Sequence, residues 1–123
     1  SRGAAEVAFV ERDRKHAAVI EENVEKVRRA GAGFADQVIL GDVLSGAFRR
    51  IRFVPELVIA DPPYAESAVY FHKLAQALSE WAPEAVIVWE VPDYPGAAGD
   101  FLRHRLDGWE LRRFGGTDFF IRK

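Results

Sequence analysis

One acidic residue of this sequence begins a rigid turn. Asp61 follows the apolar run 57–60 and precedes Pro62, Pro63 and Tyr64. Each proline fixes its own φ, restricts the residue before it to extended conformations and has no amide hydrogen to donate. The turn therefore offers fixed acceptors, the Asp61 carboxylate and backbone carbonyls, beside the flat ring of Tyr64. This combination suits a planar base that carries an exocyclic amine.

Fixed acceptors beside such an amine would assist its attack as a nucleophile. The lone pair of the amine is delocalised into the ring, so the free amine is a poor nucleophile. Hydrogen bonds from its hydrogens to Asp61 and to turn carbonyls stabilise positive charge that grows on nitrogen, which is electrostatic preorganisation. Stacking on Tyr64 would contribute roughly 1–3 kcal/mol to holding a base. The alternative is a plain strand terminator with a surface tyrosine, which the strand context makes the less favoured interpretation.

Three more acids, Glu11, Asp42 and Glu90, follow apolar runs in the same way. We expect short strands at 6–10, 37–40, 56–60 and 85–89. In a parallel sheet, ligands bind beyond the carboxyl ends of the strands. A single acid there is most often a helix cap, but four at one edge predict a polar rim that binds hydroxyls, amines or positive charge.

Helices are expected between these strands, because apolar residues recur at spacings of three and four. The expected helices begin after the capping residue Asp13, within 43–52, at 67–81 and at 99–106. Two further strands, 109–114 and 118–122, are joined by Gly115-Gly116-Thr117, which is short enough to force an antiparallel hairpin. The pattern predicts an α/β fold: a Rossmann-like, doubly wound, mainly parallel sheet with a C-terminal antiparallel hairpin.

Composition limits the remaining possibilities. The chain has 123 residues, which favours a single domain over 1–123, and its formal charge of -2 gives no global attraction to nucleic acid. It has no cysteine, which excludes disulfides and thiolate metal sites and suits a cytoplasmic location. No apolar run approaches the ~18 residues of a membrane span. His16, His72 and His104 have no partner at ligand spacing, so we expect no metal.

These motifs resemble those of the class I S-adenosylmethionine-dependent methyltransferases. Within that class they resemble the bacterial family that methylates the 2-amino group of a guanine in small-subunit (16S) ribosomal RNA. The matching segments are Ser1-Arg2-Gly3-Ala4, Phe9-Val10-Glu11-Arg12-Asp13, Asn23, Gly41-Asp42, Asp61-Pro62-Pro63-Tyr64 and Gly115-Gly116-Thr117. The resemblance covers essentially the whole chain. The Asp-Pro-Pro-Tyr turn is typical of amine methylation in general; the N-terminal lead and the hairpin turn are typical of the ribosomal RNA branch.

The resemblance implies a cofactor site for S-adenosylmethionine. Glu11 would accept hydrogen bonds from the two ribose hydroxyls, which requires an acceptor-only carboxylate. Arg12 would lie beside the adenine face. Asp42 would accept from the adenine amine, with the backbone amide of Val43 nearby.

The resemblance also implies the catalytic residues. Asp61 and Pro62, with Pro63 completing the turn, would hold the target amine, and Tyr64 would stack on the guanine. The methyl group would pass in line from sulfonium to nitrogen, with proximity contributing much of the rate. Glu90 matches an acid of the family and is interpreted either as structural or as a residue that supports the site without touching the base.

The chain departs from the family at its beginning. An RNA-contacting segment, a first central strand and a glycine-rich loop would precede Ser1, so we expect this chain to be the C-terminal part of a longer protein. The missing strand would lie between the strands that end at Glu11 and Asp61. The resemblance further implies a cytoplasmic protein, monomeric when full length, whose partner is ribosomal RNA in the small subunit or its assembly intermediate.

Two alternatives use the same residues differently. A DNA adenine or other amine methyltransferase would use the same kind of acceptor turn. A non-catalytic nucleotide-binding domain of doubly wound fold would use only the strand-end acids. Small basic clusters could contact RNA phosphates, but a solvated face is the commoner explanation for clusters of this size. They are Arg49, Arg50 and Arg52; Arg103, His104 and Arg105; and Arg112, Arg113, Arg122 and Lys123.

Overall fold

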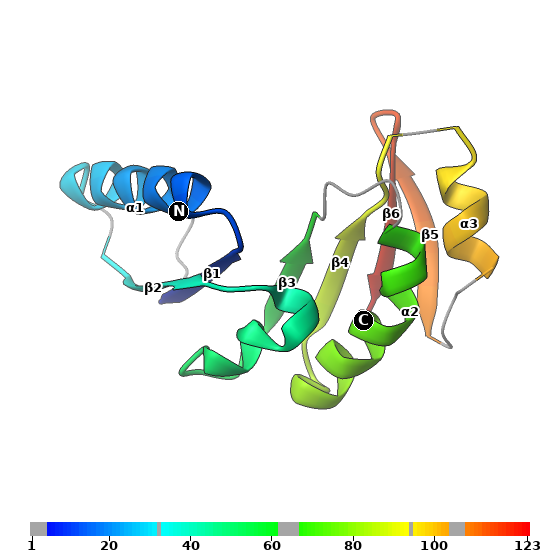
Figure 1. Ribbon diagram of the computed structural model, residues 1–123, viewed down its shortest axis with the longest axis horizontal. Helices are drawn as coiled ribbons and strands as arrows, with labels where there is room; N and C mark the ends of the chain where they lie inside the picture. Colours follow the sequence, from blue (N-terminus) through cyan, green and yellow to red (C-terminus); the bar gives the residue numbers. More distant parts are fainter. Residues whose placement is uncertain (1–4, 32, 62–66, 94, 104–107) are drawn as a thin grey trace. The chain divides into compact units, whose positions relative to one another are not determined.

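The computed structural model describes residues 5–31, 33–61, 67–93, 95–103 and 108–123. The chain divides into two compact units, residues 1–53 and 54–123. The elements, labelled in Figure 1, are β1 (Glu6–Glu11), α1 (Arg14–Arg29), β2 (Ala35–Leu40), η1 (Val43–Ser45), η2 (Ala47–Arg50), β3 (Leu57–Ala60), α2 (Ser67–Trp81), β4 (Val86–Glu90), α3 (Ala97–Arg103), β5 (Trp109–Phe114) and β6 (Thr117–Arg122). Over the described ranges, no helix is long and apolar enough to cross a membrane.

The first unit is a strand–helix–strand arrangement. β1 and β2 pair in parallel, with Glu6 opposite Ala35 and Glu11 opposite Leu40. α1 packs against both strands and buries Ala17 and Val24. These two residues are seven apart in the sequence, which places them on one helical face as the spacing predicts.

The segment after β2 differs from its prediction. Instead of one short helix within 43–52, it forms two 3₁₀ helices, η1 and η2. Gly46 lies between them with φ at 82°, a left-handed conformation that glycine adopts without steric cost and that interrupts a helical path. Phe48 of η2 is 3% exposed, so the segment still contributes a buried side chain to its unit.

The second unit is a four-stranded sheet in the order β3-β4-β6-β5. β3 and β4 are parallel, and β6 runs antiparallel to both β4 and β5. The predicted hairpin is confirmed, but its loop is only Gly115-Gly116, because Thr117 already pairs with Phe114. φ is 57° at Gly115 and 84° at Gly116. Positive φ at both central residues is typical of a type I′ turn, whose twist matches that of the strands.

The core of the second unit is aromatic. Phe71 of α2 lies 5.0 Å from the ring of Trp89, 5.2 Å from Trp109 and 5.4 Å from Phe120, measured between centroids. The first two pairs are edge-to-face, the geometry that ring quadrupoles favour. Helix α2 therefore covers one face of the sheet and joins β4 to the hairpin strands (Figure 1). Trp89 and Trp109 are both buried in this core.

Two strand edges remain open among the described residues. β1 pairs only with β2, and β3 pairs only with β4. On the sheet face opposite α2, Leu57 is 55% exposed and Ile59 is 71% exposed.

Candidate active site

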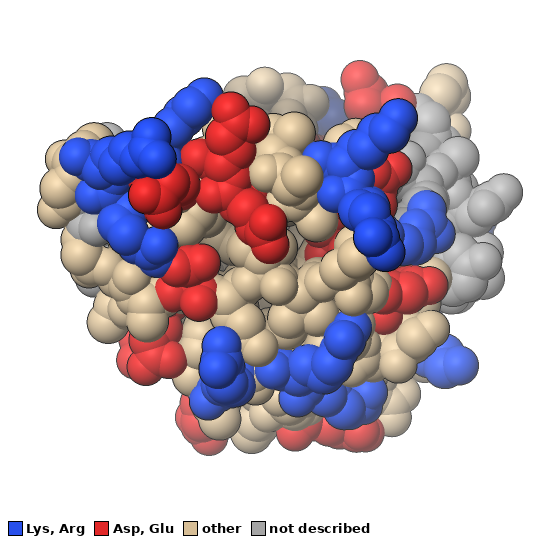
Figure 2. Space-filling model, turned by 60° about the vertical axis from the view of Figure 1, so that its left-hand side comes forward, with Lys and Arg blue, Asp and Glu red and all other residues tan. Residues whose placement is uncertain are grey.

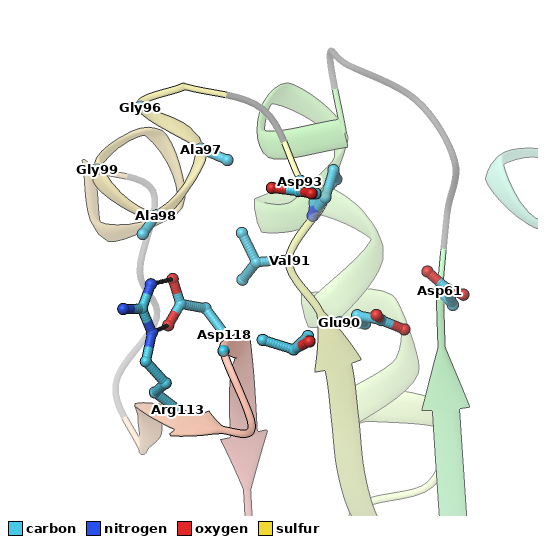
Figure 3. A pocket seen from close by; sticks show the side chains of 13 residues that line it. Asp61, Glu90, Val91, Asp93, Gly96, Ala97, Ala98, Gly99, Arg113 and Asp118 are labelled. Carbon is cyan, nitrogen blue, oxygen red and sulfur yellow. Dashed lines mark hydrogen bonds and ion pairs between the residues drawn. The ribbon is translucent and has the colours of Figure 1, made fainter.

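The parallel pairing of β3 and β4 brings two acids together. Ala60 lies opposite Trp89 in the strand register. Asp61 and Glu90, the next residue of each strand, therefore lie side by side at the carboxyl edge of the second unit. Figure 3 shows the Glu90 side chain extending from the end of β4 toward Asp61. Asp61 is exposed and Glu90 is partly buried.

Both acids line a cavity of about 590 Å³. Its walls are the ends of β3 and β4, residues 91–93, the first turn of α3 with residues 96–99, and hairpin residues 113 and 116–118. All of these belong to the second unit. Asp61, Glu90 and Asp93 are among the residues that line the cavity, so it presents carboxylate acceptors to a ligand (Figure 3).

The proximity of the two acids changes the protonation of Glu90. The negative charge of Asp61 raises the pKa of the Glu90 carboxyl above its ordinary value of 4.5; burial and a hydrogen bond with Asp61 act in the same direction. Two carboxylates at close range resist simultaneous ionisation. The pair therefore tends to retain a proton at a pH where an isolated glutamate has lost it.

The hairpin wall of the cavity is held by an ion pair that the sequence analysis did not identify. Arg113 donates from Nε to Asp118 Oδ1 at 2.9 Å and from Nη2 to Oδ2 at 3.3 Å. The hydrogen bond to Asp118, and then the negative charge of Asp118, raise the pKa of the Arg113 guanidinium further. The Val91 amide donates to the Asp118 carbonyl at 2.9 Å, which links the wall to the end of β4. The sequence does carry a signal for this pair: Arg113 and Asp118 have opposite charges and flank the two-glycine turn, so they face each other across the hairpin.

Three of the predicted catalytic residues lie outside the described residues. They are Pro62, Pro63 and Tyr64. Their roles stay predictions. Asp61, which begins the turn, is the part of this motif that the structure places.

The first unit holds the other two strand-end acids. Glu11 ends β1, and its Oε1 accepts a hydrogen bond from the Asp13 amide at 3.0 Å. Asp42 caps η1 by accepting from the Leu44 amide at 2.9 Å. The Gly41 amide donates to the Glu11 carbonyl at 2.9 Å, which fixes the two strand ends beside each other. The second carboxylate oxygen of each acid has no hydrogen-bond partner within the described part of the chain.

These two carboxylates fit the adenosine part of S-adenosylmethionine. Glu11 and Asp42 are acceptor-only groups when ionised, and ribose hydroxyls and the adenine amine are donors. Arg12 follows Glu11 directly and is exposed, and Val43 is the first residue of η1. Asp42 also caps a helix through Oδ1. Its other oxygen, Oδ2, is the one that would accept a hydrogen bond from the adenine amine.

The basic clusters do not form a free cationic surface on the hairpin. Arg112 pairs with Glu110 at 2.9 Å, and Arg113 pairs with Asp118. Arg122 donates to three backbone carbonyls, those of Ala82, Pro83 and Ala85. Figure 2 shows basic and acidic side chains interspersed on the face in view. These pairings favour a structural and solvated role for the hairpin arginines.

The α/β fold and the family match support a class I S-adenosylmethionine-dependent methyltransferase chain. A family profile matches residues 1–117, and the chain belongs to that family, which is described as conserved hypothetical protein 95. None of the curated proteins compared with this sequence matches it.

Solved structures share the fold. A Haemophilus influenzae protein described provisionally as a methylase matches with a TM-score of 0.58 at 19% identity, over 96% of this chain and 71% of its own. An Escherichia coli protein described provisionally as a methyltransferase matches with a TM-score of 0.59 at 22% identity, over 98% of this chain and 64% of its own. A Listeria monocytogenes protein predicted to be an N6-adenine-specific DNA methylase matches with a TM-score of 0.62 at 16% identity, over 94% of this chain and 30% of its own.

Proposed function

We propose that this chain belongs to an enzyme that transfers a methyl group from S-adenosylmethionine to the exocyclic 2-amino group of a guanine in small-subunit ribosomal RNA. The observation that carries the proposal is the position of Asp61, exposed beside Glu90 in a cavity of about 590 Å³. A cavity of this size can take a small planar ligand. The amine of a guanine presents two donors, and the cavity presents carboxylate acceptors.

The first unit is proposed to bind the cofactor. Glu11 accepts from the ribose hydroxyls and Asp42 from the adenine amine, with Arg12 beside the adenine face and the Val43 amide nearby. S-adenosylmethionine supplies the methyl group as an activated sulfonium substituent. Two observations support this assignment: the Gly41 hydrogen bond holds the ends of β1 and β2 beside each other, and each acid has one carboxylate oxygen without a hydrogen-bond partner among the described residues.

The second unit is proposed to bind and activate the base. Asp61 accepts a hydrogen bond from the amine, orients its lone pair and stabilises the positive charge that develops on nitrogen. The carbonyls of the turn at Pro62 and Pro63 would accept from the other hydrogen, and Tyr64 would stack on the guanine. The bidentate Arg113–Asp118 pair keeps one wall of the cavity in place, which preserves the geometry of the bound amine.

The proposal extends to the cellular setting. The substrate is ribosomal RNA in the small subunit or its assembly intermediate, in the cytoplasm, and the whole protein acts as a monomer. Since the hairpin arginines are paired within the chain, RNA binding would depend mainly on other surfaces of the protein.

A DNA adenine methyltransferase is the second candidate. The likeness in fold to the Listeria monocytogenes protein favours it. Adenine also carries an exocyclic amine on a planar ring, so the position of Asp61 suits both bases. The acceptor must therefore be identified by experiment.

The test compares methyl acceptors. The purified protein is incubated with S-adenosylmethionine labelled in its methyl group and with unmethylated small ribosomal subunits, DNA or a protein mixture. We expect label in the ribosomal RNA, at a guanine 2-amino group. Label in DNA alone would overturn the substrate, and label in none of them, with cofactor bound, would favour a nucleotide-binding domain.

Asp61→Ala provides the mechanistic arm of this test. Loss of a preorganised group that stabilises developing charge reduces kcat by about 100-fold or more. The dissociation constant for S-adenosylmethionine should not change, because Asp61 does not contact adenosine in the proposed mechanism. Glu84→Gln, which removes an exposed acid at the other end of β4, is the matched control. Full activity of Asp61→Ala would contradict the mechanism.

A further inference from the structure

We infer that Glu90 is a positioning residue for Asp61: its carboxyl group, in the protonated form, donates a hydrogen bond to the Asp61 carboxylate and turns that carboxylate toward the amine in the cavity. The inference deepens the proposed function and rests on it for its catalytic meaning. Of the two interpretations of Glu90, structural or supporting the site, it selects the second and assigns the side chain a partner.

The backbone of Glu90 is held firmly. On one side, β4 pairs with β3 up to Trp89 opposite Ala60. On the other side, Glu90 itself pairs with Phe119 of β6. A residue near a strand end that is paired in this way has little freedom, so its side chain leaves the sheet at a fixed point beside Asp61, toward which it extends in Figure 3.

Asp61 has less support from the protein. It follows the last residue of β3, it is exposed, and its charge and a hydrogen bond both act on Glu90. An exposed aspartate without a fixed neighbour samples several rotamers. A hydrogen bond from Glu90 would select one of them and leave lone pairs of Asp61 to accept from the amine.

The surrounding charges are consistent with one retained proton. Like charge at Asp61 raises the pKa of Glu90 above its ordinary value. Asp93 also lines the cavity and adds negative charge from the loop after β4. From the hairpin, Asp118 faces the same space but is paired with Arg113, so these two largely cancel.

The proton balance of the transfer agrees with this role. The amine nitrogen forms a bond to the methyl carbon as the bond from that carbon to sulfur breaks, and the electron pair of the broken bond stays on sulfur. The nitrogen then carries a positive charge and releases one proton to the Asp61 carboxylate. Because Asp61 is exposed, it passes this proton to water, so the transfer requires no proton from Glu90.

The first experiment follows the carboxyl groups without any turnover. Carbon-13 NMR titration of the protein should show a Glu90 midpoint above the ordinary glutamate value of about 4.3. Asp61→Asn should lower that midpoint, while Glu84→Gln should leave it unchanged. An ordinary Glu90 midpoint that Asp61→Asn does not move would overturn the inference, whatever the enzyme activity is.

The second experiment separates the hydrogen bond from the charge. Glu90→Gln keeps a donor of the same size, so kcat measured below the Glu90 midpoint should stay within about threefold of wild type. Glu90→Ala removes the donor, and a misplaced Asp61 should lower kcat by about 10- to 100-fold. Thermal melts of both variants establish that they fold. If Glu90→Ala is fully active while Asp61→Ala is inactive, the positioning role is wrong and the proposed function stands. If wild type transfers no methyl group, the proposed function fails. In that case the NMR titration alone decides whether Asp61 and Glu90 are paired.

Discussion

Arg122 donates a hydrogen bond from Nη2 to the backbone carbonyl of Ala85 at 2.6 Å. The same nitrogen lies 3.0 Å from the carbonyl oxygen of Ala82 and 3.2 Å from that of Pro83. A side chain on the last strand thus binds the turn that joins α2 to β4. This turn sets where β4 begins, and β4 carries Glu90 to the cavity.

Replacing Arg122 by Met should destabilise the second unit. Carbonyls that are partly buried would lose their donor, and leaving such groups unsatisfied lowers the free energy of unfolding by about 1–3 kcal/mol. Urea denaturation followed by tryptophan fluorescence measures this change. Arg112→Met is the matched control, because Arg112 forms an exposed ion pair with Glu110 and such pairs contribute less than about 1 kcal/mol. Equal losses in the two variants would show that the carbonyl contacts are not the cause.

Gly41→Ala should disturb the proposed adenosine site. A Cβ at this position would collide with the guanidinium of Arg50 and would lie 2.9 Å from the Ala47 Cβ. Arg50 donates from Nη2 to the Leu40 carbonyl at 3.1 Å, so the clash would act on the chain just before Asp42. We expect a loss of about 1–3 kcal/mol in the free energy of unfolding, as for other overpacked sites.

The functional consequence of Gly41→Ala is a weaker complex with the cofactor, measured by isothermal titration calorimetry with S-adenosylmethionine. Gly33→Ala is the control, because a Cβ there would meet nothing within 4 Å. Unchanged affinity in Gly41→Ala, with the expected loss of stability, would argue that Asp42 does not hold the adenine amine.

The elements that the sequence predicts well are those with a strong local signal. The helix over 67–81 is α2 with the same bounds. The apolar spacing of α1 predicts one face with Ala17, Ile20, Val24 and Val27, of which Ala17 and Val24 are buried and Val27 is 37% exposed. The paired glycines identify the hairpin, because few other residues accept positive φ at two successive positions. Elements of this kind are predictable because they depend on residues that are close together in the sequence.

The remainder depends on partners that are distant in the sequence. Nothing near Glu90 indicates that it pairs with Phe119, or that Asp118 and Arg113 form a wall of the same cavity. The two 3₁₀ helices were interpreted as one helix because their apolar residues have helical spacing and the left-handed φ of Gly46 is not evident from composition. The strand-end acids could be named in advance, but the protonation of Glu90 follows from a distance to Asp61 that only the folded sheet sets.

Asp13→Ala should weaken α1 in a pH-dependent way. Asp13 accepts hydrogen bonds from the Lys15 amide at 2.8 Å and the His16 amide at 3.2 Å. Both hydrogen bonds lower the pKa of Asp13 below its ordinary value of 3.8, and the bond from the His16 amide has the larger effect. A depressed pKa means that the stabilisation is present above the unfolded pKa and is lost as pH falls through the folded one.

Thermal melts should therefore show a lower melting temperature for Asp13→Ala at pH 7, by about 4 °C, and no difference near the acid end of the curve. Asp13→Asn is the control, since asparagine also caps helices but does not titrate. It should keep most of the stability at pH 7 and should not show the acid-dependent loss. A pH-independent difference between wild type and Asp13→Ala would contradict the role of the ionised cap.

Glu90→Gln should change the pH dependence of stability in the opposite direction. Because the pKa of Glu90 is raised in the folded protein, mainly by the charge of Asp61, the folded state binds this proton more tightly than the unfolded state does. The favourable contribution is complete below the unfolded pKa and is lost as pH rises through the folded one.

Wild type should thus lose stability between these two pKa values, and Glu90→Gln, which has no proton to lose at this position, should not. Melting temperatures of the two proteins should converge below the unfolded pKa and diverge above the folded pKa, with the variant the more stable. Glu84→Gln should follow wild type at every pH. A Glu90→Gln variant that is less stable than wild type above the folded pKa would mean that the ionised Glu90 carboxylate is stabilised by another group, and that Asp61 is not its dominant neighbour.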